Sequence, residues 1–334
     1  MKTNTYSLLF LFLVSLSIFT GCQPTHPKIG ILMHSYENER WIKDKDYLVE
    51  NLTRLGAEVL LEVADNDQQK QIAQAQEMIN NGAKVLIVVP IDQDAAGEIV
   101  ERAHEKDVKV IAYDRLINGC PLDYYVSTNS VNTGEIQAEY MLSLQPKGNY
   151  ALIGGSSIDN NSLRLFLGQM NVFQPLMESG DVKLVYSEFG ENWTREDGYR
   201  QAKVIMEKYA EGLTGIICGN DNQAFGAMMA LKEAGLEGKI LLAGQDAELE
   251  NVRAIKNGTQ TCTVLKPLKE TALATAELAW TVANNKTIKN QFTTESNGKV
   301  LVKSILINAS IVNKDNIETT VVASGFHNSS EINQ

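Results

Sequence analysis

The chain has 334 residues, a length that suits two domains with a hydrophobic core each. Hydrophobic residues make up 44% of it and charged residues 21%, which excludes a disordered chain and a multi-spanning membrane protein. The net charge of −11 argues against a nucleic-acid-binding surface, which needs concentrated positive charge.

The first 21 residues have the pattern of a signal peptide. Lys2 precedes an apolar run over residues 8–19, which is too short for a transmembrane helix and suits a signal sequence. The run ends in Phe-Thr-Gly-Cys, which resembles a bacterial lipobox and predicts an exported, membrane-anchored lipoprotein lipidated at Cys22. Residues 22–27 would form its tether. The alternative is ordinary secretion with an incidental Cys22, and export is expected in both cases.

An alternation of strands and helices begins after this tether. Gly56 and Gly82 follow two of the predicted helices, in the position where a left-handed residue ends a helix. Apolar strands that alternate with helices predict a doubly wound parallel sheet. The predicted segments are strands 28–33, 57–63, 84–90 and 108–113 and helices 41–55, 68–80 and 95–105.

The alternation of predicted strands and helices begins again after a polar stretch over residues 128–133. The predicted segments of this second unit are strands 148–155, 182–189, 215–218 and 239–243 and helices 162–177, 196–209 and 224–234. A helix over 268–282 and a strand over 300–307 then remain, so we expect the chain to return to the first unit.

The fold class that we expect is α/β, with two doubly wound parallel-sheet lobes joined by a multi-segment hinge. The N-terminal lobe is expected to comprise residues 28–134 and about 267–298. The C-terminal lobe is expected to comprise residues 135–266 and about 299–328.

The cysteines and histidines favour neither a disulfide nor a metal site. If Cys22 carries lipid, an odd number of cysteines remains. Cys218 and Cys262 lie in predicted strands and are interpreted as small buried hydrophobic residues. The sequence has no CxxC motif and its four histidines are far apart, so we expect no structural metal and no cofactor.

Polar residues gather where the predicted strands end. Asp114 and Arg115 directly follow strand 108–113, at the edge where open α/β sheets bind ligands. A carboxylate accepts hydrogen bonds and a guanidinium donates several in a fixed fork, so the pair suits a ligand with many hydroxyls. Polar residues at the ends of several strands are typical of a pocket between two α/β domains. The candidates at the other strand ends are Arg40, Trp41, Asp159, Asn161, Trp193, Asn220, Asp246 and Lys266.

Each of these residues also has a purely structural interpretation. Asp114 and Arg115 alone would fit a surface ion pair equally well. Asp159 and Asn220 could cap the helices that follow them. Trp193 could be a partly buried core residue, although its polar neighbours favour a ring that packs on the C–H face of a sugar.

The pattern lacks the groups of an enzyme or a transcription factor. We find no nucleophile–base arrangement, no GxSxG and no phosphate-binding loop. Asp114 and Asp159 could imitate a glycosidase pair, but further catalytic groups are missing, so no catalytic residue is expected. A sugar-responsive repressor needs an N-terminal helix-turn-helix and a basic face, where this acidic chain has a signal peptide.

Taken together, the strand-end motifs resemble the type I periplasmic sugar-binding family of bacterial ABC importers, and its xylose-binding members most of all. The resemblance covers essentially the whole mature chain. It implies that Arg40, Asp114, Arg115, Asp159, Asn161, Asn220, Asp246 and Lys266 bind sugar hydroxyls, with Trp193 and Trp41 against the ring. The motifs, in family order, are Glu39-Arg40-Trp41, Asp114-Arg115, Asp159-Asn160-Asn161, Asn220-Asp221, Gln245-Asp246-Ala247, Lys266-Pro267 and Gly325-Phe326-His327.

The resemblance also implies a function. A monomeric protein would capture a monosaccharide, with a pentose and D-xylose foremost, and deliver it to an ABC permease. The alternative is a receptor that reports the sugar to a membrane histidine kinase. Xylose-binding members carry an acidic pair after the first strand, where this chain has His34 and Ser35, and residues 118–121 differ too. These differences from the xylose-binding members leave the prediction of sugar binding unchanged and affect only the prediction of which sugar is bound.

Overall fold

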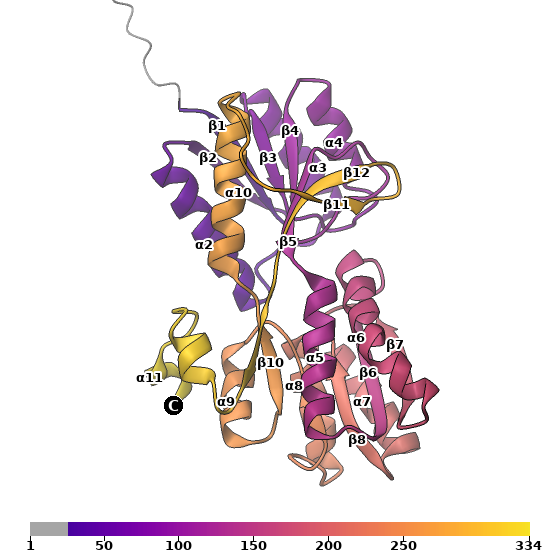
Figure 1. Cartoon of the computed structure of the whole chain (residues 1–334). Helices are drawn as coiled ribbons and strands as arrows, with labels where there is room; N and C mark the ends of the chain where they lie inside the picture. Colours follow the sequence, from indigo (N-terminus) through magenta and orange to yellow (C-terminus); the bar gives the residue numbers. More distant parts are fainter. Residues whose placement is uncertain (1–25) are drawn as a thin grey trace, which may run out of the picture.

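The computed structural model describes residues 26–334 and shows two α/β lobes, drawn one above the other in Figure 1. The predicted signal peptide and the lipidation of Cys22 lie outside the described residues. The N-terminal lobe contains a seven-stranded sheet in the order β11-β12-β5-β4-β3-β1-β2. The C-terminal lobe contains a six-stranded sheet in the order β13-β10-β9-β8-β6-β7. The predicted fold class is confirmed, with one antiparallel pair added at an edge of each sheet.

The N-terminal lobe is built from two segments of the chain. Helix α10 packs along α2 over the β1–β3 side of the sheet, and their apolar faces form one core cluster. The elements of this lobe are β1 (Lys28–Met33), α2 (Glu39–Arg54), β2 (Glu58–Val63), α3 (Gln68–Asn80), β3 (Val85–Val88), α4 (Gly97–His104), β4 (Lys109–Tyr113), β5 (Tyr124–Thr128), α10 (Leu268–Ala283), β11 (Thr293–Ser296) and β12 (Leu301–Ile307).

The C-terminal lobe holds the remaining elements, and the end of the chain packs beside α9. Its elements are α5 (Ser130–Leu144), β6 (Gly148–Ser156), α6 (Asn160–Glu178), β7 (Val182–Gly190), α7 (Arg195–Tyr209), β8 (Leu213–Cys218), α8 (Asp221–Glu233), β9 (Leu241–Ala243), α9 (Leu249–Asn257), β10 (Cys262–Leu265), β13 (Ser310–Asn313), the π-helix η1 (Glu318–Val322) and α11 (Ser329–Ile332).

Three crossings join the lobes, as a multi-segment hinge requires (Figure 1). They run from β5 to α5, from β10 to α10 and from β12 to β13. The first and third crossings are linked directly, because the Asn129 amide donates a hydrogen bond to the Asn308 side-chain oxygen at 3.1 Å. Lobe closure must therefore bend these backbone segments together.

Two of the expected lobe boundaries are wrong. Residues 299–307 were expected in the C-terminal lobe, but β12 pairs in parallel with β5 and completes the N-terminal sheet. An apolar strand fits either sheet by composition, and its pairing with β5 shows which sheet it joins. Residues 130–134 were expected in the N-terminal lobe, but they open α5, which packs against α6.

Cys120, Cys218 and Cys262 are free and buried, in agreement with the interpretation of the last two as core residues. Within residues 26–334, no group of three or more His, Cys, Asp or Glu side chains is placed to hold a metal ion. Among the described helices, none has both the length and the apolarity of a membrane span.

Candidate functional site

All ten residues predicted from the strand ends line one cavity between the lobes. The cavity encloses about 30 Å³ and receives residues from the carboxyl-terminal ends of β4, β6, β7, β8, β9 and β10 and from the first turn of α2. Asn38 and Gln245 also line it and were not predicted. The full lining is Asn38, Arg40, Trp41, Asp114, Arg115, Asp159, Asn161, Trp193, Asn220, Gln245, Asp246 and Lys266.

Arg40 occupies the centre of a buried network of charges. Its Nη2 donates to Asp114 Oδ1 at 2.7 Å and to Asp44 Oδ2 at 2.9 Å, and its Nε also donates to Asp44. Asp44 lies one helical turn further along α2 and is fully buried, where it also accepts a hydrogen bond from the Tyr113 hydroxyl. Asp44 therefore holds the guanidinium of Arg40 in place without lining the cavity.

The charges of this network stabilise one another. Burial alone would lower the pKa of Arg40, but Asp114 and Asp44 raise it well above its ordinary value. Burial alone would raise the pKa of Asp114, but Arg40 and Lys266 hold it well below its usual range. Both groups are therefore ionised at neutral pH, although each side chain is almost completely buried.

The backbone fixes Asp114 as firmly as its side chain does. Its φ is 62°, a left-handed conformation that Asp and Asn tolerate better than most residues. Its carbonyl oxygen accepts hydrogen bonds from the Tyr125 hydroxyl at 3.0 Å, from Ser127 at 2.8 Å and from the Asn161 amide at 3.0 Å. The carboxylate is therefore directed toward the cavity by a turn that three side chains support.

The two lobes are closed upon each other at this site. Asn161 of the C-terminal lobe donates to Asp114 Oδ2 at 3.2 Å. Arg115 Nε lies 3.0 Å from Asp159 Oδ2, and Arg40 Nη1 lies 3.7 Å from Asp246 Oδ1. These contacts join residues of opposite lobes, so opening the hinge must separate them.

Three buried polar atoms of the cavity residues have no hydrogen-bond partner among the described residues. They are Arg115 Nε, Trp193 Nε1 and Asp246 Oδ1. The Arg115 atom is near Asp159, as described above, and Lys266 Nζ lies 3.2 Å from Asp246 Oδ1, but neither contact forms a hydrogen bond. Arg115 Nε and Asp246 Oδ1 are therefore ion-paired, and Trp193 Nε1 has no polar partner among the described residues.

The two tryptophans of the site have different surroundings. The guanidinium carbons of Arg40 and Arg115 lie 4.0 and 5.6 Å from the centroid of the Trp41 ring, so this ring orients both cations. The six-membered ring of Trp193 rests on Gly155 and Gly219, where a Cβ atom would come within 2.2 and 2.9 Å of it. Contact of either ring with a sugar stays a prediction.

The capping interpretation is also correct for two of the candidates. Asp159 Oδ1 accepts the Asn161 N–H and caps α6, while Asn220 Oδ1 accepts the Gln223 N–H and caps α8. Asp159 keeps its second oxygen for the cavity, next to Arg115. Asn220 also donates from its amide to the Trp193 carbonyl, so it fixes the loop that carries this tryptophan.

A cluster of carboxylates behind Asp246 was not predicted. Asp221 is fully buried and accepts hydrogen bonds from Thr263, Gln260 and the Glu248 N–H. Glu248 Oε1 is buried and has no hydrogen-bond partner among the described residues. Burial, followed by the charge of Asp246, raises the pKa of Glu248 to about 9. Burial and Asp246 also raise the pKa of Asp221, and Glu39 adds to the rise at Glu248, so these neighbouring carboxyls favour a bound proton, which we assign to Glu248.

This proton makes stability depend on pH. A carboxyl whose pKa is raised on folding adds its full share to the free energy of unfolding below its unfolded-state pKa, near 4.5. This share is lost as the pH rises toward the folded-state pKa of about 9. Glu248→Gln imitates the protonated form. We expect the melting temperature of this variant to exceed that of the wild type by at least about 3 °C at pH 8.5. At pH 5 the two should agree within about 1 °C.

Differential scanning calorimetry at the two pH values measures this difference. Glu250→Gln is the matched control, because Glu250 lies two residues away and is exposed. Equal melting temperatures of Glu248→Gln and the wild type at pH 8.5 would contradict the assignment of the proton to Glu248.

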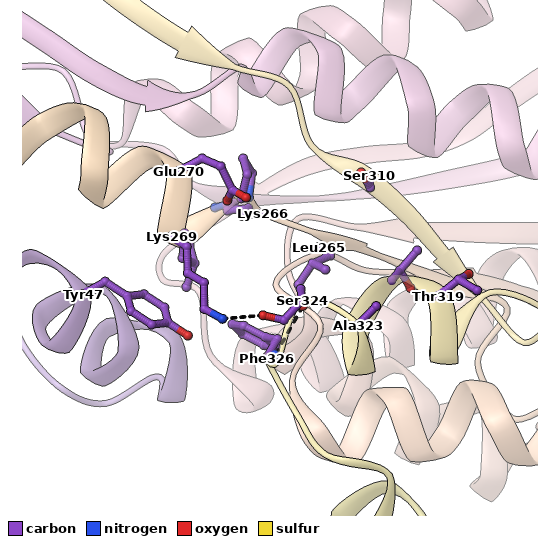
Figure 2. A pocket seen from close by; sticks show the side chains of 13 residues that line it. Tyr47, Leu265, Lys266, Lys269, Glu270, Ser310, Thr319, Ala323, Ser324 and Phe326 are labelled. Atoms are coloured by element: carbon purple, nitrogen blue, oxygen red, sulfur yellow. Dashed lines mark hydrogen bonds between the residues drawn. The ribbon is translucent and has the colours of Figure 1, made fainter. Parts of the chain in front are cut away.

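A larger hollow of about 400 Å³ lies at the hinge, next to the end of the chain (Figure 2). Tyr47, Lys269 and Phe326 are among its lining, and Lys269 donates to the Ser324 carbonyl. Lys266 is the one predicted site residue among its described lining. The charged groups of the interlobe cavity are otherwise absent from this lining, so the hinge hollow is separate from the candidate site.

Two hinged α/β lobes that close on a polar cavity define the class of bilobal solute-binding proteins. The family model described as periplasmic binding protein domain matches residues 29–287. The D-xylose-binding periplasmic protein of Escherichia coli (strain K12) is 37% identical over 91% of this chain and 92% of its own length. The multiple sugar-binding periplasmic protein SbpA of Azospirillum brasilense is 31% identical over 93% of this chain and 94% of its own.

Solved structures agree with this assignment. An ABC transporter solute binding protein from Clostridium phytofermentans, with β-D-glucose bound, superimposes with a TM-score of 0.82. It is 26% identical, and the match covers 91% of this chain and 99% of that one. The chain therefore belongs to the periplasmic binding protein family, with the fold of its type I sugar-binding members, and is a solute-binding protein and not an enzyme.

Proposed function

We propose that the protein captures D-xylose between its two lobes and delivers it to an ABC importer. The observation that carries the proposal is the cavity itself, because all ten predicted residues line it and all but the two tryptophans carry a charged or amide side chain. Each sugar hydroxyl is both a donor and an acceptor, which matches a lining that mixes carboxylates with guanidinium and amide groups. The 37% identity with a D-xylose-binding periplasmic protein supports the choice of sugar.

The proposed mechanism is lobe closure around the sugar. The closed cavity of about 30 Å³ is smaller than a pyranose, so the lobes would close less far when the sugar is bound. Asp114, Asp246 and Asp159 would accept hydrogen bonds from hydroxyls, while Arg115, Asn161 and Lys266 would donate them. Closure excludes water, so these charge-assisted bonds count for more than they would on an open surface. An epimer would leave a buried group unpaired, at a cost of about 1–3 kcal/mol.

The proposed partners follow from the same relatives. Delivery to an ABC permease, rather than to a sensor kinase, is supported by the 26% likeness to an ABC transporter solute binding protein. We further propose that the protein acts as a monomer and that a lipid on Cys22 holds it at the membrane. The apolar run over residues 8–19 and the Cys that follows it support the anchor.

Isothermal titration calorimetry of the mature protein tests the sugar directly. The panel consists of D-xylose, D-ribose, L-arabinose and D-glucose. We expect one D-xylose to bind per chain, and each other sugar to bind at least about tenfold more weakly, because tenfold corresponds to about 1.4 kcal/mol of lost pairing. Tighter binding of another sugar would replace xylose as the ligand, and no binding of any sugar would overturn the function.

A further inference from the structure

The turn that carries Asp246 has an unusual backbone. Asp246 and the next residue, Ala247, have φ values of 100° and 54°, in a region that residues other than glycine rarely adopt. Such a conformation costs free energy and persists only where neighbouring groups hold it in place. Asp246 lines the interlobe cavity, so the groups that hold this turn also set the position of a carboxylate in the candidate site.

Two elements hold this turn through hydrogen bonds, β10 and the end of the chain. The Asp246 N–H donates to the Val264 carbonyl of β10 at 2.8 Å. The Ala247 N–H donates to Thr263 Oγ1 of the same strand at 3.4 Å. From the end of the chain, His327 Nε2 lies 2.8 Å from the Ala247 carbonyl oxygen. A carbonyl oxygen can only accept, so Nε2 of this histidine carries a hydrogen and donates it.

His327 is itself fixed by its surroundings. It is almost completely buried, and its ring packs edge-on against the ring of Phe326, with centroids 4.7 Å apart. Phe326 belongs to the same hydrophobic cluster as Ala247, and its carbonyl accepts a hydrogen bond from Lys43 of α2. Lys43 Nζ also lies 4.4 Å from the centroid of the Phe326 ring. Helix α2 of the N-terminal lobe therefore holds the chain end against the turn of the C-terminal lobe.

We propose that His327 is a positioning residue for sugar binding and that it acts through Asp246. Its hydrogen bond to the Ala247 carbonyl keeps the turn in the conformation that places the Asp246 carboxylate at the cavity. His327 lies 80 residues further along the chain than Ala247 and does not line the cavity, so its effect needs no contact with the ligand. The inference rests on the proposed function, because it requires that Asp246 accepts hydrogen bonds from a sugar.

A double-mutant cycle tests the inference, with the affinity for D-xylose measured by isothermal titration calorimetry. His327→Ala is expected to weaken binding about tenfold, and Asp246→Asn roughly a hundredfold. In the Asp246→Asn background, His327→Ala should weaken binding by less than about threefold, because the carboxylate that it positions is already gone. If the two losses multiplied in the double variant, His327 would act independently of Asp246 and the inference would be overturned.

Two further substitutions of His327 separate its hydrogen bond from its volume. Gln can donate from nearly the same place as Nε2, so His327→Gln should keep the affinity for D-xylose within about threefold of the wild type. His327→Leu fills the space without a donor and should lose as much affinity as His327→Ala, which it replaces if the alanine variant does not fold. Equal affinities of the Gln and Leu variants would overturn the role of the hydrogen bond.

The matched control is Asn328→Ala. Asn328 is the next residue along the chain, is exposed and caps α11, so this substitution loosens the chain end without removing a contact to the turn. Its affinity for D-xylose should equal that of the wild type. A loss as large as that of His327→Ala would overturn the inference, because any disturbance of the chain end would then weaken binding. Absence of D-xylose binding to the wild type would instead overturn the proposed function.

Discussion

Asp114→Asn is expected to lower the affinity for D-xylose by roughly a hundredfold while the protein remains folded. The substitution keeps the shape of the side chain and, because Asn also tolerates a φ of 62°, the left-handed backbone. It removes the charge that makes hydrogen bonds from sugar hydroxyls strong, and such bonds contribute about 1.5–3 kcal/mol each. Arg40 keeps Asp44 as a partner in the variant, so the guanidinium stays in place.

Calorimetric titration of the variant measures the loss. The matched control is Asp107→Asn, because Asp107 has a similar φ of 56° but is exposed and lies at the other end of β4. Its affinity for D-xylose should equal that of the wild type. If Asp114→Asn also bound D-xylose with unchanged affinity, Asp114 would belong to a structural ion pair rather than to the binding site.

Arg40→Ala is expected to lower the free energy of unfolding by about 3–5 kcal/mol, in addition to abolishing sugar binding. The substitution removes the cation that is hydrogen-bonded to two buried carboxylates, Asp44 and Asp114. An uncompensated buried charge costs far more than an exposed one.

Urea denaturation without ligand measures this cost. Arg102→Ala is a matched control, since Arg102 pairs with Glu98 at the same i, i+4 spacing that joins Arg40 to Asp44, but on an exposed surface. The control should lose only about 0.3–0.5 kcal/mol from its ion pair. Similar losses in the two variants would mean that burial does not strengthen the Arg40 network.

Much of the candidate site could be predicted from the sequence, because the carboxyl ends of parallel strands meet at one edge of a sheet. Asp114 directly follows an apolar run, and Asp159, Asn220 and Asp246 lie in the short loops after other strands, so their meeting around one cavity follows from the strand pattern. Their roles in binding a sugar stay predictions. The pairing of Arg40 with Asp44 is also visible at helical spacing, but it was not predicted.

Other features depend on contacts between distant segments. The composition of β12 does not specify which sheet it joins, and this choice is made by its pairing with β5. No helix was predicted where α5 lies, because the polar residues 128–133 gave no helical pattern and its buried face is completed by α6. The raised pKa of Glu248 arises from burial beside Asp246, which only the folded loops bring about. A single sequence carries no direct signal of such neighbours.

A crystal structure of the mature protein grown with D-xylose tests the central claim most directly. We predict one pyranose in the interlobe cavity, with hydroxyls within hydrogen-bond distance of Asp114, Arg115 and Asp246, and with its ring beside Trp193. Trp193 Nε1, which has no hydrogen-bond partner among the described residues, should donate a hydrogen bond in that complex. A sugar bound elsewhere, such as in the hinge hollow, or a cavity without sugar at saturating D-xylose, would contradict the account.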